Sequence, residues 1–202
     1  MDAQESSSSP GAVEYIVTGG HWNREYQVTQ GGTTIYHVEN KSTSPDKPHL
    51  LFFAGNTTEG PVVGSAHTNR FSSDVQITLG DPNLPKTVTA AKLIKKGLMS
   101  FRYVIELEVD RQRRTFTWKR TEQADSFGPT ASLKLTDEAN EVVAMFLPGG
   151  GRVQRDGVVR LYADLGESVK LMTFIAALAL REKTRFRAVN PTSDLAMPVT
   201  YS

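Results

Sequence analysis

The sequence predicts a mostly β protein: a closed or nearly closed antiparallel barrel of about twelve strands around a buried apolar helix near the C-terminus. Three observations lead to this fold class. Short stretches of alternating apolar and polar residues recur along the chain, as strands with one buried face require. Segments rich in Gly, Pro, Ser and Asp separate them, as turns would. One segment with helix-forming composition, Glu167–Thr184, is apolar on every side in its middle.

The clearest strands form a hairpin. In Arg102–Asp110 the apolar residues fall at alternate positions, which places them on one face of a half-buried strand. After a short polar turn at Arg111–Arg113, Phe116 and Trp118 share one face of the next strand. A second hairpin joins Ala131–Thr136 to Glu141–Leu147 through the turn Asp137–Asn140. The other predicted strands are Tyr15–Thr18, Arg24–Thr29, Thr33–Glu39, His49–Ala54, Val62–Thr68, Val75–Leu79 and Gly157–Ala163.

The predicted helix, Glu167–Thr184, differs in character from the rest of the chain. Between Leu171 and Leu180 only Thr173 is polar, so no face of the helix is suited to water. Ten apolar residues are too few to cross a bilayer, which takes about 20. An enclosing sheet would cover every side of such a helix. Asp164 followed by Glu167 resembles a capping box at its start.

The length of 202 residues fits one domain. The first residues, MDAQESSSSPG, have neither the basic start nor the apolar segment of a signal peptide. We therefore expect a disordered tail at residues 1–11, a single domain at residues 12–202, no transmembrane segment, and a cytoplasmic location. The chain has no cysteine, which excludes disulfides, thiolate metal sites and a cysteine nucleophile.

Strands followed by one late apolar helix are the layout of the superfamily of tubby C-terminal domains, LURP-one-related proteins and phospholipid scramblases. The chain resembles its small fungal members, called tubby C-terminal-like proteins, over roughly Val13 to Asn190. Three segments give this resemblance: YHVENKSTSPDKPHLLFFAG (Tyr36–Gly55), YVIELEVDRQRRTFTWKRT (Tyr103–Thr121) and LMTFIAALALREK (Leu171–Lys183).

The resemblance implies a twelve-stranded barrel threaded by a hydrophobic helix. It also implies a function in binding, because tubby domains bind phosphoinositides through basic residues on the barrel surface. Scramblases add a palmitoylated cysteine cluster and a membrane segment. The absence of cysteine and of a long apolar run disfavours scrambling.

Basic residues give the one signal for a partner. The net charge is only +1, yet ten Lys and Arg residues fall between Lys86 and Arg120 against three acidic residues. Two predicted turns in this region, Leu93–Gly97 and Asp110–Arg114, would form one basic face if adjacent strands brought them together. Such a face would bind anionic phospholipid or phosphoinositide headgroups. The candidate residues are Lys92, Lys95, Lys96, Arg111, Arg113 and Arg114.

The sequence contains little that indicates catalysis or cofactor binding. The histidines, at positions 21, 37, 49 and 67, lack the HxxxH or HExxH spacing of a zinc site, so packing or surface roles are expected. The glycines of Val17–Trp22 and Leu147–Arg152 are followed by no helix and predict turns rather than a phosphate-binding loop. No metal or cofactor is expected, and nucleic acid is disfavoured. The sequence thus favours a non-enzymatic binding or adaptor module over the alternative, a barrel that holds a small apolar molecule as a carrier or an enzyme.

Overall fold

The structure is a computed structural model that describes residues 11–19, 25–41, 49–68, 72–84, 88–97, 100–121, 131–149 and 155–189. The predicted tail lies outside the described residues, except for Gly11. The same holds for His21 and for most of the two predicted glycine-rich turns.

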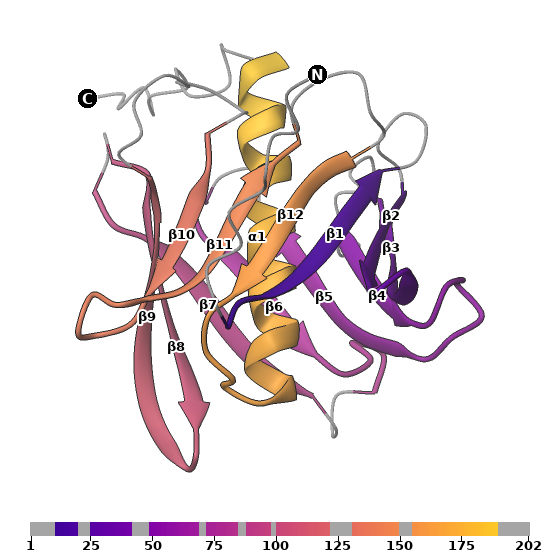
Figure 1. Ribbon diagram of the computed structural model, residues 1–202, viewed down its shortest axis with the longest axis horizontal. Coiled ribbons are helices and arrows are strands. Elements are labelled where there is room, and N and C mark those ends of the chain that lie inside the picture. The colour runs from indigo at the N-terminus through magenta and orange to yellow at the C-terminus, as the bar shows by residue number, and fades with distance from the viewer. Residues whose placement is uncertain are drawn as a thin grey trace, which may run out of the picture.

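Twelve antiparallel strands form a closed barrel in which each strand pairs with its neighbour along the chain (Figure 1). The last strand pairs with the first, Val13 lying opposite Leu161, so the sheet has no free edge. This confirms the predicted fold class. The strands are β1 (Val13–Gly19), β2 (Glu25–Gln30), β3 (Thr33–Asn40), β4 (Leu50–Ala54), β5 (Val62–Thr68), β6 (Val75–Leu79), β7 (Thr89–Lys95), β8 (Arg102–Val109), β9 (Gln112–Arg120), β10 (Leu133–Thr136), β11 (Val142–Pro148) and β12 (Arg155–Leu161).

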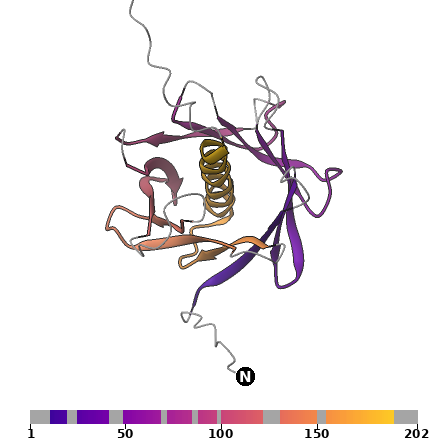
Figure 2. The same ribbon diagram turned by 90° about the horizontal axis from the view of Figure 1, so that it is seen from above.

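The barrel encloses a helix, α1 (Glu167–Val189), which runs along its interior (Figures 1 and 2). In the orientation of Figure 1, α1 begins at the lower end of the barrel and finishes at the upper end. The apolar middle of the helix is buried on every side, as predicted. The exposed fractions are 8% for Leu171 and 0% for Phe174, Ile175, Leu178 and Leu180.

The start of α1 differs from the predicted capping box. The Asp164 carboxylate accepts a hydrogen bond from the Gly166 amide (3.0 Å), outside the first turn of the helix. Glu167 forms an ion pair with Lys170 one turn further on (2.5 Å). The two acidic residues thus hold the linker and the helix surface, and they do not exchange the reciprocal bonds of a capping box.

The β8–β9 hairpin shows how alternation directs side chains. Tyr103, Ile105 and Leu107 face the core, and polar residues alternate with them on the outer surface. The turn comprises only Asp110 and Arg111, with φ values of 51° and 61°, the left-handed backbone of a type I′ hairpin turn. The predicted turn at Arg111–Arg113 was therefore wrong, because Gln112 and Arg113 already belong to β9.

Strand β7 was not predicted, and part of it was assigned to a turn at Leu93–Gly97. In the structure Leu93, Ile94 and Lys95 lie in the strand, and the connection to β8 begins at Lys96. Leu93 is the only side chain of β7 that is buried. Pairing with β6 along Thr89–Leu93 forms the strand despite this weak apolar pattern.

Helix α1 packs most closely against β4, β5 and β6. Gly64 of β5 allows this approach. A Cβ atom at Gly64 would lie 2.6 Å from Cδ1 of Ile175 on α1 and 3.0 Å from the Thr78 carbonyl oxygen. Both distances are shorter than van der Waals contact, so the helix lies against β5 because this residue has no side chain.

The upper end of α1 is fixed by hydrogen bonds to β2 and β3. The carboxylate of Glu182 accepts hydrogen bonds from the Tyr26 hydroxyl and from Nδ2 of Asn40 (2.8 Å), and Arg185 pairs with it (2.7 Å). Burial, followed by the charge of Glu182, raises the pKa of Tyr26 far above its ordinary value, so the hydroxyl stays a donor. Among the described residues, no helix has the length and apolar character needed to cross a membrane.

Candidate functional site

The six predicted binding residues divide into two groups at opposite ends of the barrel. The upper group is Lys92, Lys95 and Lys96, and the lower group is Arg111, Arg113 and Arg114. Strand β8 separates the two turns, and its eight residues span about 23 Å at a rise of about 3.3 Å each. That length exceeds the screening distance of about 8 Å at physiological ionic strength. The predicted convergence of the two turns on one face was therefore wrong.

The physical reason is the meander itself. Successive turns of an antiparallel meander alternate between the two ends of the sheet, so turns on either side of one strand never meet. Some of the six cations also pair with carboxylates. These pairs are Lys92 with Asp74 (3.0 Å), Arg113 with Glu106 (2.6 Å) and Arg114 with Asp137 (3.5 Å).

The carboxylate of Asp74 ties β6 to β7 and gives a test of this local pairing. Burial alone would raise its pKa, but hydrogen bonds from the Lys95 amide (3.0 Å) and the Lys92 ammonium lower the pKa below 3.8 overall. Because the pKa of Asp74 is lower in the folded state than in the unfolded state, its ionised carboxylate stabilises the fold at any pH above the unfolded-state pKa. This stabilisation is lost as the pH falls through the folded-state pKa. Asp74→Asn should therefore destabilise the protein near neutral pH, and its difference from wild type should shrink below about pH 4. Urea unfolding of both proteins across this range measures the difference; one that is independent of pH would contradict it.

Charge on the described residues is divided between the two ends of the barrel. We counted side chains in loops, in the two residues at each end of every strand except residues 155 and 156, and in residues 167–170 and 181–185 of α1. The upper end has ten basic residues (Lys41, Lys95, Lys96, Arg102, Lys119, Arg120, Lys134, Arg181, Lys183, Arg185) and four acidic ones (Glu25, Glu39, Asp74, Glu182). The lower end has four basic residues (Arg111, Arg113, Arg160, Lys170) and ten acidic ones (Glu14, Glu59, Asp81, Glu108, Asp110, Asp137, Glu138, Glu141, Asp164, Glu167). Over these counted side chains of the described residues the net charges are +6 and −6, so this part of the barrel is strongly polarised.

Three cations lie in one row across the upper part of the sheet. Arg102 of β8 lies directly opposite Lys119 of β9, and Lys119 lies directly opposite Lys134 of β10. Their neighbours Tyr103 and Trp118 face the core, so the three cations face outward. We call Arg102, Lys119 and Lys134 the cationic ladder.

The cationic ladder is unfavourable for folding. Directly opposite residues on adjacent antiparallel strands have Cβ atoms about 5 Å apart, and like charges in such pairs destabilise a sheet. The Lys119 ammonium donates to Oδ1 of Asn140, a neutral residue in the turn between β10 and β11, so this side chain extends from its strand position toward the lower end and keeps its charge. Lys96 adjoins the ladder, because its amide donates to the Arg102 carbonyl (2.8 Å). A row of cations at a cost in stability is typical of a surface that binds an anion.

The sequence prediction included Lys95 and Lys96, which lie at this end of the barrel, among the binding residues, but it missed the ladder. One signal could have found it. With a two-residue turn at Asp110–Arg111, antiparallel pairing puts Arg102 opposite Lys119. The three-residue turn that we predicted shifts the register and hides the pair.

The histidines have packing and surface roles in the described part of the chain. His37 is buried against Phe53, with ring centroids 6.2 Å apart. Nδ1 of His49 accepts a hydrogen bond from the Thr68 amide (3.2 Å), and the His49 and His67 rings lie 5.4 Å apart. Among the described residues, no group of three or more His, Asp or Glu side chains could hold a metal ion.

Comparisons of the chain with protein-family models, with curated proteins and with solved structures gave no match.

Proposed function

We propose that this chain is a non-enzymatic, tubby-like binding or adaptor module that docks its upper end on an anionic membrane surface. In this proposal the protein is cytoplasmic and peripheral to the membrane. The cationic ladder is the observation that supports it best, because three like charges lie in directly opposite positions, an arrangement that disfavours folding.

The polarity of the whole barrel supports an oriented encounter. A −6 lower end is repelled by an anionic bilayer while the +6 upper end is attracted, so the molecule would approach with the ladder foremost. Each cation close to an anionic membrane contributes about 1 kcal/mol. The three ladder residues, flanked by Lys95 and Lys96, are together enough for reversible binding.

A membrane is favoured over nucleic acid by the uncharged residues of this end. Ile94, next to Lys95, is exposed at 38% and can enter the headgroup region. The exposed large hydrophobic residues in the described part of the chain are all aliphatic. Aromatic side chains on which bases stack are the usual companions of cations in single-stranded nucleic-acid sites.

We expect the neutral triple variant Arg102→Gln, Lys119→Gln, Lys134→Gln to lose binding to anionic vesicles. Loss of three cations should weaken binding by about 3 kcal/mol, or roughly a hundredfold. Flotation with vesicles of phosphatidylcholine, alone or mixed with phosphatidylserine, measures this. Wild-type binding should need phosphatidylserine and fall with added salt.

The matched control removes the same charge from the other end: Arg111→Gln, Arg113→Gln, Arg114→Gln. We expect this variant to bind as wild type does. Equal losses in the two triple variants would show that net charge alone matters and would contradict the proposal. If wild type bound double-stranded DNA but no vesicle, the partner of the upper end would be nucleic acid and the membrane proposal would be wrong.

A further inference from the structure

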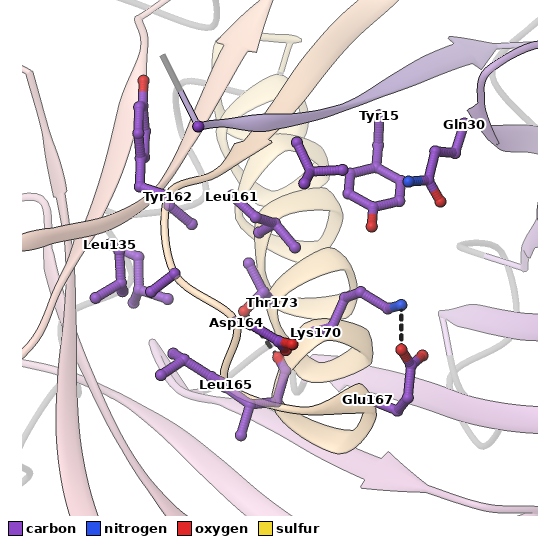
Figure 3. A pocket seen from close by; sticks show the side chains of 16 residues that line it. Tyr15, Gln30, Leu135, Leu161, Tyr162, Asp164, Leu165, Glu167, Lys170 and Thr173 are labelled. Carbon is purple, nitrogen blue, oxygen red and sulfur yellow. Dashed lines mark hydrogen bonds and ion pairs between the residues drawn. The ribbon is translucent and has the colours of Figure 1, made fainter. Parts of the chain in front are cut away.

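A cavity of about 260 Å³ lies inside the barrel beside the start of α1 (Figure 3). It is bounded by the first two turns of α1, by the linker at residues 162–165, and by residues of β1, β2, β10, β11 and β12. Its position follows from the packing of the helix. Because α1 lies against β4–β6, where Gly64 allows close approach, space remains on the opposite side of the barrel.

The inner wall of the cavity is apolar and fully enclosed. Leu135 and Ala144 are each 1% exposed, Val169 is 3% exposed and Val143 is 6% exposed. The outer part is polar and open to water, since Gln30, Asp164 and Glu167 are exposed residues. A closed apolar floor below a polar mouth suits one amphiphilic molecule with its apolar part inward.

Among the described residues that line the cavity, Lys170 is the only basic one. Its side chain is 21% exposed and pairs with Glu167, whose side chain is 81% exposed (2.5 Å). Burial would lower the pKa of Lys170, but the bond to Glu167 and the nearby hydroxyls of Tyr15 and Tyr36 raise it overall, so the ammonium stays charged. An ion pair with so exposed a partner contributes little and is readily exchanged.

We propose that the cavity binds a small monocarboxylate with an apolar body. The carboxylate takes the place of Glu167 on the Lys170 ammonium, beside the Tyr15 hydroxyl, and the apolar body lies against Leu135, Val143 and Leu161. Figure 3 shows Tyr15, Lys170 and Leu161 around the same space. The volume equals that of about nine waters, which admits a ligand of about ten non-hydrogen atoms, such as octanoate.

A carboxylate fits this position better than an ammonium or an alcohol. Lys170 has an acidic partner that a ligand carboxylate can replace, and the N-terminus of α1 favours negative charge at the same place. A ligand ammonium would lie next to the Lys170 charge. An alcohol would leave that charge paired only with Glu167 and gain no ionic contact.

The test is titration of the full chain with octanoate, octanol and octylamine, followed by backbone amide shifts and by melting temperature. We expect octanoate to bind more tightly than the other two and to shift amides of α1 and β11. Lys170→Met retains the apolar stem and should weaken octanoate binding at least tenfold, with octanol binding unchanged. Glu167→Gln, at an exposed position that folding tolerates, should strengthen octanoate binding several-fold by removing the competitor.

The proposal would be overturned if octylamine bound more tightly than octanoate, or if Lys170→Met bound octanoate as tightly as wild type does. It would also be overturned if neither wild type nor Glu167→Gln bound any of the three ligands. The Arg102→Gln, Lys119→Gln, Lys134→Gln variant should bind octanoate as wild type does. The two proposals can therefore fail independently, because the ladder lies on the outer face of the sheet, whereas the cavity lies inside the barrel, where Leu135 is buried.

Discussion

Leu178→Asp should unfold the protein. Leu178 has no exposed surface, and it lies in the middle of a helix that is covered by protein on all sides. An unpaired carboxylate at this position costs several kcal/mol in desolvation, and the lost leucine packing adds to it, against a typical total stability of about 5–15 kcal/mol. Circular dichroism with heating should show no cooperative transition.

The matched control is Ser168→Asp, ten residues earlier on the same helix. Ser168 is exposed in the first turn, where a negative charge is favourable to the helix. We expect this variant to melt at or above the wild-type temperature. A Leu178→Asp variant that stays soluble and melts cooperatively would mean that α1 can leave the barrel without loss of the fold.

Gly64→Ala should destabilise the protein by about 1–3 kcal/mol, as is usual for an added methyl group in a packed core. The new Cβ would overlap Cδ1 of Ile175, and Ile175 has no exposed surface into which it can move. Ile175→Val removes that atom and alone costs about 0.5–1.5 kcal/mol. The double variant should therefore lose less stability than the two single variants together, as measured by denaturant unfolding.

A control for this cycle is Ile105→Val in β8, which is also buried but is three strands away from β5. Its effect should add to that of Gly64→Ala, because distant sites act independently. If the stability losses of Gly64→Ala and Ile175→Val simply added in the double variant, the contact between α1 and β5 would not be close. Some other constraint would then fix the position of the helix.

The sequence was sufficient for the fold where large side chains alternate or cluster. Tyr103, Ile105 and Phe116 set the inner face of the β8–β9 hairpin, and the absence of a polar stripe on α1 required an enclosing sheet. Strand β7 could not be predicted this way. It has one buried side chain, Leu93, and its alanines and lysines are typical of helices or loops. Its strand conformation comes from backbone hydrogen bonds to β6, and such pairing leaves no pattern in the side chains from which it could be predicted.

The candidate site depended on finer details than the fold did. A turn of two residues rather than three decides that Arg102 and Lys119 are partners, so an error of one residue concealed the cationic ladder. The cavity was beyond prediction for a different reason. It exists because Gly64 allows α1 to lie close to one wall of the barrel. No local pattern in the sequence indicates the space that this leaves at the other wall.

The pairing of β1 with β12 also determines the order in which the chain can fold. Every other ladder joins strands that are neighbours in sequence, so hairpins from β1–β2 to β11–β12 can form as the chain is synthesised. Closure must wait until Leu161 meets Val13, a contact of long sequence separation that slows folding. Helix α1 comes later still, yet it has to lie inside the closed sheet. Until α1 is made, the growing sheet exposes its apolar face, which makes this interval the period of greatest risk of aggregation.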